Sequence, residues 1–174
     1  MLKQSRPAML SFPSSYLHAI LRDFQFMPKF LNLAALHPNP VERIKFIISG
    51  LVGGMHLNIQ VCGVRGFLNP ILGETLQAYC PQNKTYFLAE QTSHHPPISH
   101  YTMYNERFEL YGWGELIAGL SGINTLKGER KGKLTIKVRD PEDHTKFNMY
   151  TVQESPIKIE GLLAGDRILS MKGL

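Results

Sequence analysis

The hydrophobic pattern of this chain changes its period once, at about Gly54, and that change limits the fold more than any other feature. Before Gly54, apolar residues recur every three or four positions, which is typical of helices. After it, apolar and polar residues alternate, which is typical of strands. Because no helical segment separates the later strands, neighbouring strands should pair antiparallel. The pattern therefore predicts an α+β fold, with N-terminal helices followed by an antiparallel β-meander.

One short amphipathic helix is predicted near the N-terminus. It has Ser14 and Ser15 as possible caps and an apolar stripe from Tyr16 to Phe24. Such a stripe fits a helix packed on its own core. Another apolar segment covers residues 26–35, and Pro28 starts or interrupts it.

The longest predicted helix runs from Asn39 to Met55. Asn39 can cap it, Pro40 occupies the first helical position, and Glu42 can reach back to complete a capping box. Its expected core face consists of Val41, Ile44, Ile47, Ile48 and Leu51, whereas Arg43 and Lys45 are expected in solvent. The glycine pair at positions 53 and 54 should end the helix.

The strands after the helices are short and separated by turn residues. Predicted strands are Leu57 to Val64, Thr75 to Tyr79, Tyr86 to Gln91, Ile98 to Tyr104, Phe108 to Ile117, Lys133 to Arg139, Phe147 to Gln153, Lys158 to Leu163 and Arg167 to Met171. Predicted turns include residues 81–84, 105–107, 128–132, 140–143 and 165–166. Such a sheet either curls into a barrel or leaves open edges.

Two adjacent histidines closed off by two prolines form the least probable stretch of the sequence. His94 and His95 follow a predicted strand, and Pro96 and Pro97 end it because proline cannot donate to a sheet ladder. The histidines should therefore lie at the rim of the sheet. Neighbouring imidazoles that gain protons near an anion make a donor pair suited to a phosphate.

Three motifs in this chain resemble those of the oxysterol-binding-protein-related family of lipid transfer proteins. The run from Glu90 to Pro97 is similar to that family's Glu-Gln-x-Ser-His-His-Pro-Pro motif. The segment from Asn69 to Glu74 resembles its Asn-Pro-x-Leu-Gly-Glu segment, and Asn39 to Arg43 resembles its Asp-Pro-Val-Glu-Arg helix start. The resemblance extends from about Pro13 to the end, and it covers only the N-terminal part of a longer domain.

The resemblance implies that the sheet is part of an incomplete lipid-binding β-barrel around an apolar tunnel. Residues 1–174 would be a single, apparently truncated lipid-binding domain, with a leader (1–12), lid and helices (13–55) and sheet (56–174). The lid would close over the tunnel, with Leu17 near its inner face. The chain is then either a fragment or short isoform, or another partner covers the open edge of its sheet.

The resemblance also assigns roles to individual residues. His94 and His95 match the pair that contacts the 4-phosphate of phosphatidylinositol 4-phosphate, and Asn69 matches a headgroup-contacting asparagine, although it could equally be a turn residue before proline. The family has a lysine where this chain has Gly66. Arg65 is a doubtful substitute, because a one-residue offset in an extended segment points a side chain to the other face.

Composition and charge restrict the partners. The 174 residues suffice for one ordinary globular domain. The excess of 19 Lys and Arg over 14 acids favours anionic partners such as membrane surfaces or nucleic acid, without choosing between them. The densest basic run, Lys127 to Arg139, is expected to be a solvated face or a membrane patch. No nucleic-acid-binding motif appears. No secretory leader or sustained apolar run appears, which predicts a cytoplasmic protein. The family resemblance implies that it is peripheral at organelle membranes or membrane contact sites.

Three functions are compatible with these features to different degrees. The first is intracellular lipid binding and transfer, in which a sterol or phospholipid is exchanged against phosphatidylinositol 4-phosphate without a cofactor or a chemical step. The second is an enzyme with His94, His95 and His100 as metal ligands or bases; it is disfavoured because adjacent histidines suit one metal poorly and no His-Glu-x-x-His spacing occurs. The third is a truncated, non-transferring regulatory or interaction module of the same family. A lipid-binding protein with no catalytic residue and no bound metal is the preferred interpretation.

Overall fold

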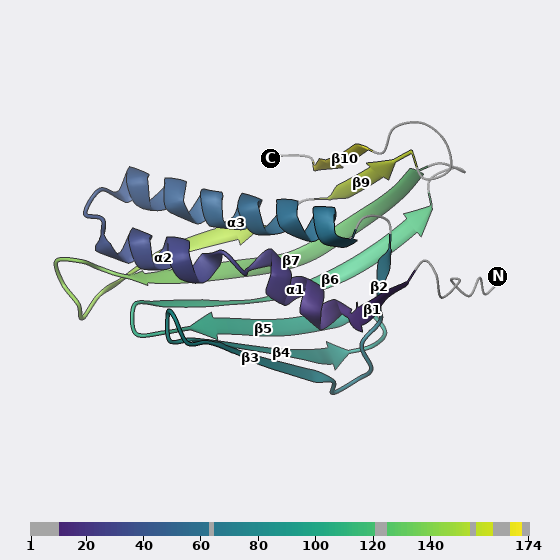
Figure 1. The fold of residues 1–174 in the computed structure, drawn as a ribbon, viewed down its shortest axis with the longest axis horizontal. Coiled ribbons are helices and arrows are strands. Elements are labelled where there is room, and N and C mark those ends of the chain that lie inside the picture. Colours follow the sequence, from purple (N-terminus) through teal and green to yellow (C-terminus); the bar gives the residue numbers. More distant parts are fainter. Residues whose placement is uncertain (1–10, 63–64, 121–124, 154–155, 162–167, 172–174) are drawn as a thin grey trace.

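The computed structural model describes residues 11–62, 65–120, 125–153, 156–161 and 168–171. Three helices precede nearly all of the strands and lie across one face of a long, curved sheet (Figure 1). The helices are α1 (Tyr16–Asp23), α2 (Met27–Leu36) and α3 (Pro40–Cys62). The strands are β1 (Ser11–Ser15), β2 (Gly66–Leu68), β3 (Thr75–Cys80), β4 (Thr85–Ser93), β5 (Ile98–Tyr104), β6 (Phe108–Leu120), β7 (Thr125–Arg139), β8 (Phe147–Gln153), β9 (Ile157–Glu160) and β10 (Ile168–Met171). The predicted α+β class is confirmed.

The helices start close to the predicted residues, but their capping differs in part from the prediction. Asn39 caps α3 as predicted, because its Oδ1 accepts a hydrogen bond from the Val41 N–H at 2.9 Å. The expected capping box does not form, since Glu42 instead pairs with Lys45 at 2.7 Å. Ser15 precedes α1 without a side-chain capping bond.

The prediction that the glycine pair ends α3 is wrong, and so is the strand predicted from Leu57 to Val64. The helix continues through both glycines to Cys62, and residues 63–64 lie outside the described chain. The reason lies in packing against α1: a Cβ placed on Gly54 would lie 1.8 Å from the carbonyl oxygen of Asp23. Gly54 therefore allows two helix backbones to approach closely, which a helix interior needs as much as a helix end does.

The predicted core face of α3 is also wrong. Only Ile47 of the expected aliphatic face is fully buried, whereas Val41, Ile44 and Ile48 are exposed, and so is Val52. Arg43, expected in solvent, is 5% exposed. The helix is thus rotated from its expected orientation and turns an apolar stripe to the solvent.

By length and composition, α3 is long and apolar enough to cross a membrane, with a mean hydropathy of 1.3 over its most apolar window in Pro40–Val61. Core helices of soluble proteins reach the same length and hydropathy. The helix packs against both α1 and α2, and Ile47 belongs to the main hydrophobic core. Its hydropathy is therefore consistent with a helix that has one packed face and one open face.

The main sheet has eight strands and is not closed. Its order is β10-β9-β7-β6-β5-β4-β3, with β8 paired to β7 beside β9, and all pairs are antiparallel. Strands β5 and β8 have the predicted bounds. The turn predicted at residues 128–132 is wrong, because these residues lie inside β7 and pair with β6 from Gly114 to Ala118.

A second, two-stranded sheet was not predicted. Strand β1, just before α1, pairs in parallel with β2, which follows α3. It begins at Ser11, so the last two residues expected in the polar leader belong to a strand. This pair ties the start of the helical segment to the loop that leads into the main sheet (Figure 1).

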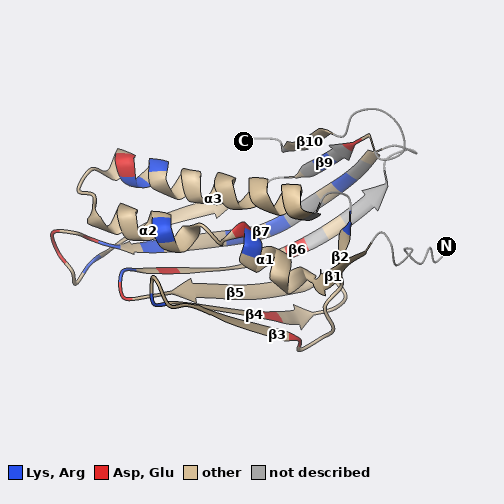
Figure 2. Ribbon diagram, viewed as in Figure 1, with Lys and Arg blue, Asp and Glu red and all other residues tan. Residues whose placement is uncertain are grey.

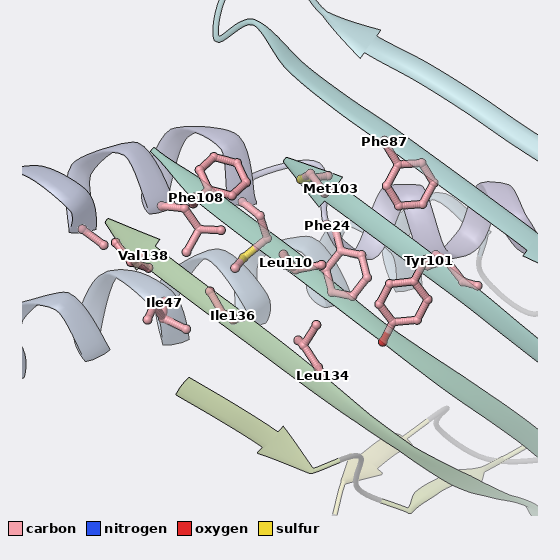
Figure 3. Close-up of a cluster of buried hydrophobic side chains, with 14 of the residues drawn as sticks. Phe24, Ile47, Phe87, Tyr101, Met103, Phe108, Leu110, Leu134, Ile136 and Val138 are labelled. Carbon is pink, nitrogen blue, oxygen red and sulfur yellow. The ribbon is translucent and has the colours of Figure 1, made fainter. Parts of the chain in front are cut away.

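The core lies between the helices and one face of the sheet. Side chains from α1, from α2 and from Phe24 just after α1 meet inward-facing residues of β4 to β7, including Phe87, Tyr101 and Leu110 (Figure 3). Along β4 the buried residues alternate strictly with exposed ones, as expected for a sheet covered on one side only. The opposite face of the sheet is open in the described structure.

Candidate functional site

The two histidines lie in the turn between β4 and β5, at the rim of the sheet as predicted. Both side chains are exposed, and their rings meet edge to face with centroids 4.6 Å apart. The turn contains a cis peptide bond between His95 and Pro96. The arrangement presents two imidazoles to the solvent from one short turn.

Three hydrogen bonds hold this turn and the end of β4 beside the loop from Asn69 to Glu74. The Gly73 N–H donates to the Gln91 carbonyl at 2.9 Å, and the Gln91 N–H donates to the Glu74 carbonyl at 3.0 Å. His94 Nδ1 lies 3.2 Å from the carbonyl oxygen of Pro70. Two motifs that are about twenty residues apart in sequence therefore form one structural unit.

The contact with Pro70 determines which nitrogen of His94 carries a hydrogen. A carbonyl oxygen only accepts, so Nδ1 must donate, and the neutral ring then has Nε2 as a bare acceptor. An anion at Nε2 requires the second proton, which makes both ring nitrogens donors. His94 is thus oriented by the backbone of the neighbouring loop and can offer a charged Nε2–H outward.

The loop that supports His94 has its own internal bonds. The Glu74 N–H donates to the Ile71 carbonyl at 3.0 Å, and Glu74 Oε2 accepts from the Ile71 N–H at 3.1 Å. Gly73 adopts φ +78°, a backbone angle that residues other than glycine rarely adopt. The loop is therefore held in one shape before any ligand arrives.

Gln91 and Ser99 form a buried polar pair beneath the histidine turn, and sequence reasoning did not single them out. The Ser99 hydroxyl donates to Gln91 Oε1 at 2.5 Å, and Gln91 Nε2 donates to the Ser93 carbonyl at 2.7 Å. Gln91 is 1% exposed. A glutamine on the inward-facing row of β4, after Phe87 and Ala89, is the sequence feature that could have identified it.

The other predicted site residues occupy different surroundings. Asn69 is exposed at the start of the supporting loop, in the same unit as His94. The guanidinium of Arg65 stacks on the Phe12 ring in β1, 5.2 Å from its centroid, and Arg22 covers the same ring at 4.5 Å. The structure therefore brings Asn69 to the histidine turn and places Arg65 against the small sheet.

Leu17, expected on the inner side of a lid, is completely buried in α1. It belongs to the core cluster between the helices and the sheet, and α1 packs mainly against α3 and β4. This environment is that of a core residue, and its role in a lid stays a prediction.

A hollow of about 660 Å³ lies on the open face of the sheet, turned away from the helices. Its lining includes Leu88, His100, Tyr111, Trp113 and Lys133. Trp113 is 37% exposed there. His100 Nδ1 is 2.8 Å from the Thr92 hydroxyl on this face. Within the described ranges, no group of three His, Cys, Asp or Glu residues could hold a metal ion.

Comparisons with known proteins connect this geometry to one family. The family model described as Oxysterol-binding protein matches residues 1–173. Oxysterol-binding protein 9 of Dictyostelium discoideum is 32% identical over 161 residues, which cover 91% of this chain and 35% of that protein. Human oxysterol-binding protein-related protein 8 is 31% identical over 192 residues, covering 99% of this chain and 20% of that protein. The chain thus spans between a fifth and about a third of the length of these relatives.

Solved structures show the same fold. The Osh1 ORD domain in complex with ergosterol superposes with a TM-score of 0.88 at 24% identity, and covers 99% of this chain and 40% of that one. The Osh3 ORD in complex with PI(4)P from Saccharomyces cerevisiae superposes with a TM-score of 0.83 at 19% identity, covering 98% of this chain and 44% of that one. The helices and sheet described above therefore form part of that fold.

Proposed function

Because this chain belongs to the oxysterol-binding protein family, we propose that it binds a single lipid and exchanges a sterol or phospholipid against phosphatidylinositol 4-phosphate. The family comprises lipid-binding proteins rather than enzymes, so binding is the whole of the proposed activity. Solved relatives hold ergosterol, cholesterol and PI(4)P, which are the ligand classes carried into the proposal. We propose that residues 1–174 act as one domain in the cytoplasm, peripheral at organelle membranes or contact sites.

The observation that carries the proposal is the union of the histidine turn with the supporting loop. His94 is fixed through Nδ1 to Pro70, so its Nε2 is available to an anion. His95 lies beside it, and Asn69 belongs to the same loop. Two protonated imidazoles and an amide N–H donor are the groups that a phosphomonoester prefers, and charge-assisted hydrogen bonds are the stronger kind. We assign the phosphate of the headgroup to this corner of the sheet.

The position of the turn also indicates where the acyl or sterol portion would lie. Ile98, just after the prolines, pairs with Glu115 in β6, and β6 and β7 continue beyond this point past the end of α3 (Figure 1). The core under the helices is filled by side chains, whereas none of the three described helices lies over this extension (Figure 1). A lipid with its headgroup at His94 could lay its apolar portion along the helix side of the extension. Burial would contribute about 25 cal/mol per Å² of apolar area.

The proposed headgroup site is weaker than that of a complete family member in one respect. Gly66 stands where the resembling motif has a lysine, and Arg65 is turned to Phe12. The headgroup would therefore depend mainly on the histidine turn.

Native mass spectrometry after incubation with liposomes containing sterol and phosphatidylinositol 4-phosphate tests this proposal. The expected result is a one-to-one lipid adduct. His94→Ala with His95→Ala should abolish the phosphoinositide adduct and retain the sterol adduct. The matched control is His56→Ala with His144→Ala, which removes two exposed histidines elsewhere and should bind like the unmodified chain. Absence of any adduct from folded protein would refute lipid binding by this chain.

A second candidate function is a non-transferring regulatory or interaction module. The exposed stripe on α3, which includes Val41, Ile44, Ile48 and Val52, favours it. Isolated aliphatic side chains are ordinary on a surface, but four at helical spacing on one helix are typical of a protein contact. Sedimentation velocity over a range of concentrations separates the two candidates: association without lipid uptake supports the module, and a lipid-binding monomer contradicts it.

A further inference from the structure

Strand β7 carries a row of cations on the face of the sheet that the helices leave open. Leu134, Ile136 and Val138 are buried beneath the helices, so the alternating residues of the strand point the other way. These residues include Lys127, Lys131, Lys133, Lys137 and Arg139. Figure 2 shows the blue positions recurring along β7. Alternate residues lie about 7 Å apart in a strand, so the row extends for roughly 40 Å.

Neighbouring strands concentrate this charge further. Lys127 is directly opposite Lys158 of β9, and like charges at opposed positions oppose strand pairing. Lys137 pairs with Glu109 of β6 at 3.0 Å, and Lys158 pairs with Glu160 at 2.7 Å. Lys127, Lys131 and Lys133 are exposed. An anionic surface outside the protein would offset the repulsion between these lysines.

The acidic residues at the same register do not balance the row. Among the residues whose side chains the structure describes, they are Glu109 and Glu115 of β6 and Glu160 of β9. Against these three carboxylates the same part of the face presents six cations, the five of β7 and Lys158. The described part of the face therefore retains an excess of positive charge, and its exposed cations are Lys127, Lys131 and Lys133.

Exposed apolar side chains lie beside the cations. Trp113 is opposite Lys133, and Met149 of β8 is opposite Lys137. Phe147 is opposite Arg139, where the guanidinium stacks on its ring at 4.9 Å. Met149 is 64% exposed. Aromatic side chains next to lysine and arginine suit the boundary between lipid headgroups and acyl chains, where one part is apolar and the other charged.

We propose that this surface, here called the β6–β8 face, docks on an anionic lipid bilayer. It is defined by Lys127, Lys131 and Lys133 with Trp113, Phe147 and Met149. The inference deepens the proposed function, on which it rests for the need to reach a membrane. A nucleic acid would engage the lysines but leave Met149 and Phe147 in water, so the combination of charge and apolar groups favours a bilayer.

Trp113 is the only tryptophan of the chain and lies on the proposed face, so it reports docking directly. The chain is titrated with vesicles of phosphatidylcholine alone or with about 30 mol % phosphatidylserine, and tryptophan emission is followed alongside vesicle sedimentation. Docking predicts a shift of emission to shorter wavelength and quenching by brominated acyl chains, with anionic vesicles only. Raising the salt concentration should weaken binding, because exposed charges are screened.

The test variant is Lys127→Glu with Lys133→Glu, and the matched control is Lys29→Glu with Lys45→Glu. All four lysines are exposed, and both variants change the net charge equally, but the control residues lie on the helices. Each lysine near an anionic surface contributes roughly a fivefold change in affinity. The test variant should therefore bind anionic vesicles at least about 25-fold more weakly, whereas the control loses much less.

Two results would overturn the assignment of this face. One is vesicle binding with no change in Trp113 emission, and the other is equal weakening by the test and control variants. Binding to duplex DNA that exceeds binding to vesicles would assign the cations to a nucleic acid instead. A water-soluble short-chain phosphoinositide separates docking from lipid capture, because it needs no membrane. The double variant Lys127→Glu, Lys133→Glu should bind this soluble lipid normally. The double variant His94→Ala, His95→Ala should lose that binding, so a failure of docking can be told apart from a failure of lipid capture.

Discussion

Arg43 should be among the most important single side chains for the stability of this fold, although its sequence context suggests a solvated helix residue. Its Nε donates to the His37 carbonyl at 2.8 Å and its Nη2 to the Pro38 carbonyl at 2.9 Å, which closes the turn between α2 and α3. Its Nη1 lies 3.7 Å from Asp140 in the turn after β7. One guanidinium thus joins two helices to the turn between β7 and β8.

Replacing this residue by methionine tests the assignment, because methionine keeps the apolar stem and removes the donors. Each lost hydrogen bond from the charged group costs about 1.5 kcal/mol, so the pair costs about 3 kcal/mol, and the long contact with Asp140 adds little. For a chain of this size, that loss lowers Tm by roughly 6 to 12 °C. Arg43→Lys should lose about half as much, since an ammonium cannot reproduce the planar fork.

Urea unfolding followed by circular dichroism measures the free energy of unfolding for each variant. Lys45→Met is the matched control on the same helix, because it removes an exposed pair with Glu42 and should change stability by less than about 0.5 kcal/mol. If Arg43→Met were no more destabilising than Lys45→Met, the turn-closing role of the guanidinium would be wrong.

Three further predictions concern packing and charge. Gly54→Ala should destabilise by about 3 kcal/mol or prevent folding, because its Cβ would meet the backbone of α1, whereas Gly53→Ala meets only a phenylalanine side chain and should stay within about 1 kcal/mol, as thermal unfolding would show. Ile47→Ala should cost about 3 kcal/mol and Ile48→Ala less than about 1 kcal/mol in the same assay, and equal losses would contradict the orientation of α3. Hydrogen bonds from Asn148 and two backbone N–H groups lower the pKa of Asp140 to about 2. The contribution of this carboxylate to the stability of the fold is therefore present above the ordinary pKa of 3.8 and is lost as the pH falls towards 2. The difference in Tm between Asp140→Asn and the unmodified chain should shrink from pH 6 to pH 2.5.

Local sequence patterns were sufficient to predict strands that have one buried face and one solvent-exposed face. Strands β5 and β8 have the predicted ends because their side chains alternate and their turns contain proline, asparagine or aspartate. The prolines after His95 end β4 as expected, since they cannot donate to a ladder. Such features depend on the residue and its neighbours in sequence, which is why they could be predicted.

The errors occur where a distant segment decides the structure. Gly54 lies within a helix, and it is glycine because the backbone at the end of α1 passes close to it. Gly132 lies within β7, and it is glycine because a Cβ there would be 2.2 Å from the Trp113 carbonyl oxygen. Both glycines allow a close backbone approach, which sequence alone cannot distinguish from a turn. Arg43 is buried because two carbonyls and Asp140 receive it. In the site, the motif positions were predictable, but the buried pair of Gln91 and Ser99 depends on the register of β4 with β5.

The histidine turn, the α3 stripe and the β6–β8 face lie on different elements, and this separation determines how the proposed activities combine. His94 is tied to the loop before β3, the stripe belongs to α3, and the lysines lie on β7. Lipid capture and membrane docking, and the association expected of the second candidate function, should therefore respond to different substitutions, because sites without shared partners contribute independently. A variant such as Ile48→Gln would weaken association and leave vesicle binding unchanged. If that change also abolished docking, the chain would reach the membrane as an oligomer, and the surfaces would have to be reinterpreted as one.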